Sequence, residues 1–241
     1  MKCRTCGARV DDELPFCTGC GQSFLTRKRQ RMYPIKAPAQ MCGRNPVQHV
    51  HIPRNLPKRF REVLNLAKGE KPLQLFFERH PIILLISIVS PHTAWVFPRK
   101  MLPKPEGGSW VPDFMICDWT SVGPLWTIVE LESPTAKVTS SRGISGKCRH
   151  AQQQIDDYRN HVSKNAAFLR DGGLLGIHGR CPAWIVMGRT EERSTTERER
   201  IAHLREYGIE VASYDRLLYD CQERSAVKRR LVIGGKRSLE T

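Results

Sequence analysis

The sequence predicts an α/β protein in which helices flank a mixed central sheet, preceded by a small module that a metal ion stabilises. Three observations support this fold class. Candidate strands alternate with helices over residues 58–221, four cysteines stand in two close pairs within residues 1–25, and a basic, proline-rich stretch over residues 26–57 separates the two regions. A chain of 241 residues is long enough for one sizeable core and a small extra module.

The amino-terminal module is expected to bind one structural zinc ion. Both cysteine pairs have the Cys-x-x-Cys spacing, and a glycine follows each pair. Four thiolates suit tetrahedral zinc, and so short a segment has too little core to fold without such a staple. A redox dithiol would need a single pair and a βαβ context. Residues 1–25 resemble the zinc ribbons at the ends of many bacterial proteins, which bind DNA or protein; the expected ligands are Cys3, Cys6, Cys17 and Cys20.

The connector and the overall charge indicate a polyanionic partner. The chain carries 39 Lys and Arg against 24 Asp and Glu, a net charge of +15, which favours nucleic acid. The run Arg27–Arg31 either follows a phosphate backbone or is a solvated spacer, and both interpretations stay open. The sequence starts without a secretory signal, and its longest apolar run, Ile82–Val89, is too short to span a bilayer. We therefore expect a cytoplasmic protein with no membrane association.

The elements of the main domain follow from periodicity and turn signals. Apolar residues recur at helical spacing or in short β-rich runs, and the turn signals include Gly107-Gly108 and Val122-Gly123-Pro124. Helices are expected at about residues 60–67, 73–79, 147–169, 195–207 and 214–221, and strands at 94–97, 113–117, 125–132, 183–188 and 209–213. This order implies a mixed sheet with helices on its faces. Residues 222–241 form a basic tail to which no element is assigned.

Three carboxylates interrupt the apolar pattern of two neighbouring strands. The strand at 125–132 is apolar on both faces along most of its length, which predicts a central position, and alternation places Glu130 and Glu132 on the face of Ile128. Asp113 begins the preceding strand. Buried carboxylates cost several kcal/mol unless a cation lies among them. Oxygen ligands suit Mg²⁺ or Mn²⁺, which in a basic protein indicates phosphodiester hydrolysis. The alternative is that these acids lie at strand ends and contact water.

The long helix at 147–169 places two polar groups near its apolar stripe. Gln154 and Tyr158 are one turn apart, and Tyr158 belongs to the stripe while Gln154 lies along its edge. Spacing alone does not distinguish a functional glutamine from an ordinary flanking residue.

Taken in series, these motifs resemble a nuclease family. Pro112-Asp113, Glu130-Leu131-Glu132 and the Gln154–Tyr158 helix are similar to the PD-(D/E)xK nucleases, with the glutamine-tyrosine motif of the RecB-like branch. More specifically, five segments resemble the nuclease domain of the Shedu anti-phage defence proteins over residues 60–221: PDF, VELESP, HAQQQIDDY, WIVMGR and IEVASYDRLL. The resemblance implies that Asp113 and Glu130 ligate a catalytic metal. It also implies that an acid on the preceding helix, for which Glu78 is best placed, joins them, and that Gln154 and Tyr158 orient these groups or the DNA.

One position departs from the family pattern. Glu132 stands where the general pattern has a lysine, whose charge would stabilise the attacking hydroxide and the phosphate. Glutamate can instead bind a metal or accept a proton, so we do not interpret the change as loss of activity. Lys137 or Lys147 is a candidate replacement cation, and a solvent-facing lysine is the alternative for both.

The resulting hypothesis is a metal-dependent DNA endonuclease of prokaryotic anti-phage defence, with structural Zn²⁺ and catalytic Mg²⁺ or Mn²⁺. The main alternative is a catalytically inactive nuclease fold that binds or senses nucleic acid, for which the glutamate at position 132 is the best argument. A scaffold whose zinc ribbon binds protein is the third. Substrate form, activation trigger and assembly into a homo-oligomer are left open.

Overall fold

The computed structural model describes residues 52–89, 94–141, 143–190 and 194–236, with side chains described as far as residue 225. The four predicted zinc ligands and the basic connector as far as residue 51 lie outside the described residues, so the zinc ribbon stays a prediction. No described helix is long and apolar enough to cross a membrane.

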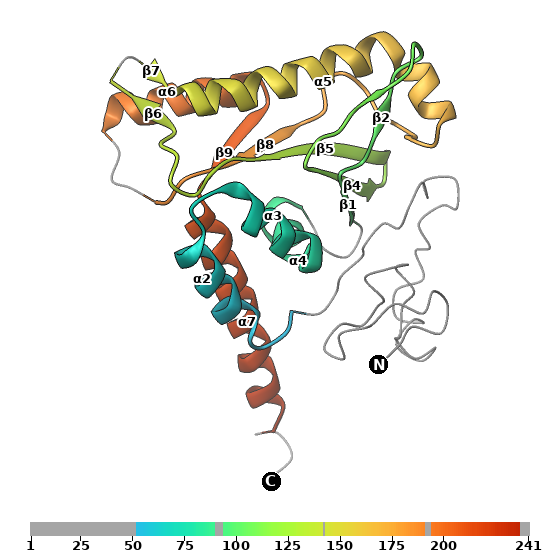
Figure 1. The fold of residues 1–241 in the computed structure, drawn as a ribbon. Coiled ribbons are helices and arrows are strands. Elements are labelled where there is room, and N and C mark those ends of the chain that lie inside the picture. Colours follow the sequence, from blue (N-terminus) through green and yellow to red (C-terminus); the bar gives the residue numbers. More distant parts are fainter. Residues whose placement is uncertain (1–51, 90–93, 142, 191–193, 237–241) are drawn as a thin grey trace.

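The centre of the domain is a mixed five-stranded sheet of order β1-β4-β5-β8-β9 (Figure 1). The first three strands pair antiparallel, whereas β5, β8 and β9 are parallel to one another. Their bounds are Ala94–Pro98 for β1, Phe114–Thr120 for β4, Gly123–Leu131 for β5, Ala183–Val186 for β8 and Ile209–Ala212 for β9. The predicted α/β class and mixed sheet are confirmed, and β5 is the central strand that its two apolar faces predicted.

Helices cover both faces of this sheet (Figure 1). The helices α5 and α6 lie on one face, and α2, α3, α4 and α7 lie on the other. Their bounds are Leu56–Leu66 for α2, Glu70–Arg79 for α3, Ile82–Ile88 for α4, Gly146–Asp171 for α5, Thr195–Glu206 for α6 and Tyr214–Lys236 for α7. Two small ribbons pair β2 (Leu102–Pro103) with β3 (Ser109–Trp110) and β6 (Thr139–Ser140) with β7 (Gly143–Ile144).

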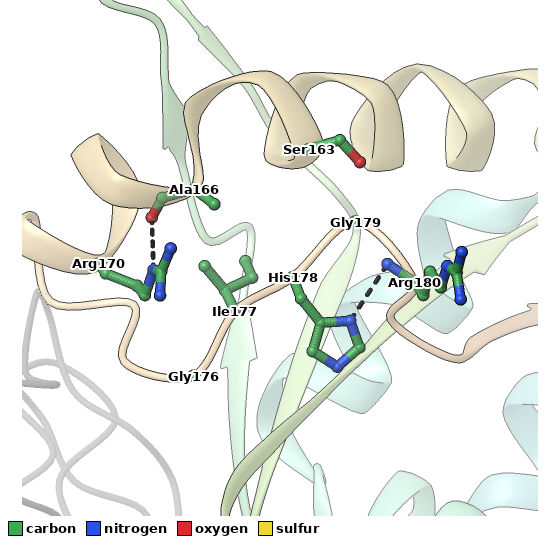
Figure 2. Close-up of a pocket in the computed structure, with 8 residues that line it drawn as sticks. All are labelled: Ser163, Ala166, Arg170, Gly176, Ile177, His178, Gly179 and Arg180. Carbon is green, nitrogen blue, oxygen red and sulfur yellow. Dashed lines mark hydrogen bonds between the residues drawn. The ribbon is translucent and has the colours of Figure 1, made fainter.

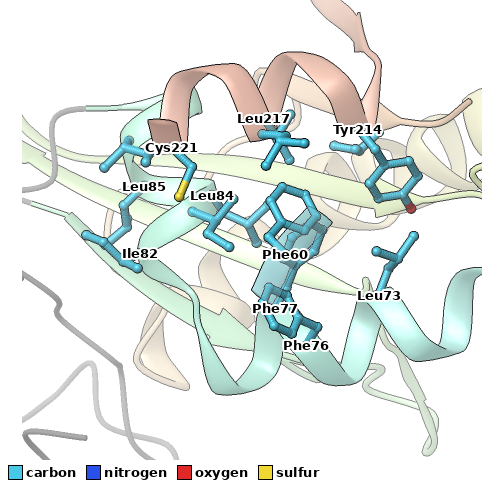
Figure 3. Close-up of a cluster of buried hydrophobic side chains, with 14 of the residues drawn as sticks. Phe60, Leu73, Phe76, Phe77, Ile82, Leu84, Leu85, Tyr214, Leu217 and Cys221 are labelled. Atoms are coloured by element: carbon cyan, nitrogen blue, oxygen red, sulfur yellow. The ribbon is translucent and has the colours of Figure 1, made fainter. Parts of the chain in front are cut away.

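An aromatic cluster fixes α3 and α7 against the second face of the sheet (Figure 3). The Phe60 ring lies 5.3 Å from that of Phe77, and Phe77 stacks 6.1 Å from Tyr214. Each fully buried aromatic side chain contributes about 1.5–3 kcal/mol. The hydroxyl of Tyr214 donates a 2.7 Å hydrogen bond to the backbone carbonyl of Glu132, so this core also holds the end of β5 in place.

Two helices differ from the sequence-based expectation. The last helix was expected to end at Cys221, but α7 continues to Lys236 through the segment left unassigned. The long helix contains one non-helical residue, Asn165, with φ −124° and ψ 24°. Its side-chain amide donates to the carbonyl of His161, and such local bonding competes with the helical ladder.

Candidate active site

The register between β4 and β5 brings the first two predicted ligands together. Phe114 pairs with Val129, so Asp113, just before β4, lies opposite Glu130. The backbone N–H of Asp113 donates to Glu130 Oε1 at 3.2 Å, and the N–H of Leu131 donates to Asp113 Oδ2 at 2.9 Å. The two carboxylates are thus held across neighbouring strands at the carboxyl end of β5.

The third carboxylate follows directly after β5 on the same face as Glu130. Only 5% of the Glu132 side chain is exposed, and its Oε2 is buried without a hydrogen bond. The ammonium of Lys147, in the first turn of α5, lies 3.7 Å from this oxygen, close enough for an ion pair but too far for a good hydrogen bond. Of the two lysines that the sequence offered, Lys147 is the one that reaches Glu132.

The helix α3 contributes polar side chains from its face toward the carboxylates. Gln74 Nε2 donates to Asp113 Oδ1 at 3.2 Å. Burial raises the pKa of both Asp113 and Glu132, and the charge of Glu70, one turn before Gln74, adds to that rise. Glu78, one turn after Gln74, is 3.7 Å from Arg99 Nε. Glu78 was predicted from the sequence and Gln74 was not, although the spacing of four residues between Glu70, Gln74 and Glu78 places all three along one helix face.

Arg99 is a second residue that the sequence did not single out. It is the only non-glycine residue with positive φ among those described, at 49°. Its N–H donates to the backbone carbonyl of Asp113 at 2.9 Å, and its charge lowers the pKa of that carboxylate. Backbone strain of this kind persists where the surrounding structure holds it, often at functional sites.

The helix α5 brings Tyr158 to the site from the other side. Tyr158 is buried beside Glu130, where its hydroxyl opposes the rise that burial causes in the pKa of that carboxylate, and its ring packs edge-on against Trp110 at 5.9 Å. Gln154 is half-buried one turn earlier, and no hydrogen bond joins its side chain to another described residue. The motif residues are therefore close along the helix, and Tyr158 is the one in contact with a carboxylate.

The carboxylates of the site are buried, and the cations near them are too few to offset their negative charge. Burial is the largest cause of the raised pKa values of Asp113, about 6, and Glu130, about 8, and the charges of neighbouring carboxylates also raise them. The pKa of Glu132 is also raised by burial, which the Lys147 charge opposes. Burial and the charges of Glu130 and Asp113 raise the pKa of Tyr158. A cation at this place would remove the repulsion and favour the ionised carboxylates.

The donor set suits a hard divalent cation, but the side chains are turned toward protein donors. No three His, Cys, Asp or Glu side chains in the described part of the chain are arranged to hold one metal ion. Both oxygens of Asp113 accept hydrogen bonds, and Glu130 Oε1 accepts one. The unbonded Glu132 Oε2 and the raised pKa values nevertheless fit oxygen ligation of Mg²⁺ or Mn²⁺ after rotation of these side chains.

Comparison with protein families identifies this region. The model of the Shedu protein SduA C-terminal domain matches residues 67–218, well over half of the chain. The chain belongs to this family. Shedu proteins are anti-phage defence nucleases, so the resemblance drawn from the five motifs is confirmed. The matched Shedu domain includes all six predicted catalytic positions and excludes the cysteine pairs. No curated protein gives a significant match to the chain.

Proposed function

We propose that the protein is a divalent-metal-dependent endonuclease that hydrolyses phosphodiester bonds of DNA in anti-phage defence. The observation that carries this proposal is the group of buried, incompletely compensated carboxylates at the end of β5, inside a domain of the Shedu family. Their chemistry matches a site that gains stability when a cation binds.

Each residue of the site has a proposed role. Asp113 and Glu130 would hold Mg²⁺ or Mn²⁺, which when bound activates water and offsets charge on the phosphate. Gln74 positions Asp113 through its hydrogen bond, and Tyr158, buried beside Glu130, limits the positions that this carboxylate can take. Glu132 accepts a proton or adds an oxygen ligand. Gln154 and Glu78 remain proposed site residues on the family pattern alone.

Lys147 is proposed to supply the positive charge that the family pattern places at position 132. Its ammonium approaches Glu132 from the start of α5, where the helix dipole also favours negative charge nearby. Two thirds of the Lys147 side chain is exposed, so it can also contact a phosphate group of a bound strand. The positive charge of the lysine would thus come from the helix α5 and not from the strand β5.

Cationic and aromatic side chains beside the carboxylates form a proposed path for the DNA backbone. Lys104 Nζ lies 4.2 Å above the ring of Trp110, and that ring packs on Tyr158. Arg99, more than half exposed, is held beside Asp113 by its backbone N–H. Cations near an acidic site would hold phosphates that the carboxylates alone repel, with little dependence on base sequence.

The alternative, an inactive nuclease fold that binds nucleic acid, is favoured by Glu132 and by the protein hydrogen bonds of Asp113. The deciding experiment incubates purified protein with plasmid and linear DNA, with and without Mg²⁺ or Mn²⁺. Asp113→Asn and Glu130→Gln should each lower divalent-dependent cleavage by about a hundredfold or more while DNA binding survives. The exposed control Glu223→Gln should cleave like the parent. Equal cleavage by parent, Asp113→Asn and Glu130→Gln would exclude the proposed metal site.

A further inference from the structure

A pocket of about 510 Å³ lies between the second half of α5 and the loop that leads to β8 (Figure 2). The glycines at its start, Gly172, Gly173 and Gly176, are not followed by the lysine and serine or threonine of a phosphate-binding loop. The residues that line the pocket are Ser163, Ala166, Arg170, Gly176, Ile177, His178, Gly179 and Arg180.

The polar groups of this pocket are cations and hydrogen-bond donors, and its lining contains no acid. Arg170 donates through Nε to the carbonyl of Ala166 at 3.0 Å, which orients the guanidinium and leaves its two terminal nitrogens to donate to a ligand. The N–H of Arg180 donates to His178 Nδ1 at 3.2 Å, so in the neutral ring the other nitrogen carries the proton and is a donor. The hydroxyl of Ser163 adds a further donor on the α5 side.

Close packing fixes the loop that forms one wall. Gly176 has φ +72°, and a Cβ there would lie 2.7 Å from the carbonyl oxygen of Pro124. A Cβ at Gly179 would overlap the hydroxyl of Ser163 and lie 2.9 Å from the carbonyl oxygen of Arg159. The backbone therefore approaches β5 and α5 as only glycine permits, and the donors stand on a wall with a defined shape.

The pocket is separate from the carboxylate site. Gly176 contacts the start of β5 at Pro124, whereas Glu130 lies near its other end. Six residues at 3.3 Å per residue place these points about 20 Å apart. A ligand in the pocket therefore does not occupy the metal site, although a single nucleic-acid strand is long enough to reach both.

We propose that this pocket binds nucleotide phosphate, with Arg170 at one end and Arg180 at the other as the anion-binding side chains (Figure 2). A guanidinium presents paired donors that match phosphate oxygens, and the histidine and serine donors complete a set without a competing carboxylate. The volume lies in the range of small-ligand sites and has room for a whole mononucleotide. The phosphate belongs either to a free nucleotide or to a polynucleotide strand. This proposal does not depend on cleavage, so binding is tested in the absence of Mg²⁺ and Mn²⁺.

The experiment measures binding of two probes to the full chain by calorimetry and fluorescence anisotropy. The probes are dAMP, with deoxyadenosine as the phosphate-free control, and a fluorescein-labelled single-stranded oligonucleotide. The double variant Arg170→Gln with Arg180→Gln should weaken binding about tenfold or more, since a charge-assisted bond is lost at each position. Arg198→Gln removes the same charge from an exposed position on α6 and serves as the matched control.

The pattern of losses identifies the source of the phosphate. Parent protein that binds dAMP but not deoxyadenosine, with the loss confined to the double variant, would assign the pocket to free nucleotides. A loss seen only with the oligonucleotide would assign it to a strand. Replacing both arginines with lysine should retain part of the affinity, because charge is kept while the paired-donor geometry is lost. If the double glutamine variant binds both probes as Arg198→Gln does, the proposal is wrong.

Discussion

Glu130→Gln offers a test of the buried charge that does not depend on activity. Glu130 is 4% exposed, and its pKa rises from 4.5 to about 8 in the folded protein. The folded protein therefore retains a proton that the unfolded chain has lost. A raised carboxylate pKa lowers the free energy of unfolding progressively as pH increases from about 4.5 to about 8.

The size of the effect follows from this shift. Each pKa unit corresponds to about 1.4 kcal/mol, so a rise from 4.5 to about 8 makes the full penalty for ionised Glu130 about 5 kcal/mol in the absence of a cation. Glutamine keeps the shape without the charge and should remove most of that penalty. For a domain of this size, the gain corresponds to a rise in Tm of roughly 10 °C at pH 8 and only a degree or two at pH 5.

Differential scanning fluorimetry of metal-free protein across pH 5–8 measures this difference. Glu223→Gln, an exposed substitution on α7, controls for the chemical change and should leave the Tm unchanged at every pH. If Glu130→Gln shifts the Tm equally at pH 5 and pH 8, or lowers it at pH 8, then Glu130 is not a buried acid without a counter-charge.

Three further predictions concern the charges around the site and the amino-terminal region. Lys147→Met should reduce cleavage about tenfold and raise the apparent pKa in the pH dependence of cleavage, because Glu132 loses its ion pair. Lys137→Met should have little effect on either quantity. Equal behaviour of the two variants would show that Lys147 is not part of the site. Metal analysis should find about one zinc per chain, and Cys17→Ser should abolish it without lowering the Tm of the main domain; zinc retained in that variant would argue against the four-thiolate site. Neutralising Arg27, Lys28, Arg29 and Arg31 together should make DNA affinity less dependent on salt concentration. An unchanged salt dependence would indicate that the connector separates the two regions without binding DNA.

The sequence was sufficient where periodicity fixes geometry. Alternation along β5 placed Glu130 and Glu132 on one face, and the order of strands and helices predicted a mixed sheet. The 3.6-residue period predicted the inward face of α5, including Tyr158.

The sequence was insufficient where contacts join distant segments. Gln74 meets Asp113 across 39 residues, and Arg99 meets it across the pairing of β1 with β4, at a residue with positive φ. Neither the approach of two elements nor a left-handed arginine has a local signature in one sequence. The length of α7 was missed because the basic composition beyond Cys221 gave no apolar stripe from which to extend the helix.

The most direct test of the central claim is calorimetric titration of Mn²⁺ into zinc-saturated protein at pH 7, in two buffers of different ionisation enthalpy. Metal ligands bind in the deprotonated form, and Glu130 with a pKa of about 8 is largely protonated at that pH. We expect one tight Mn²⁺ site that releases about one proton per ion in the parent and is lost in Asp113→Asn. Binding of Mn²⁺ without proton release, or with the same affinity in Asp113→Asn, would contradict a metal site built on these carboxylates.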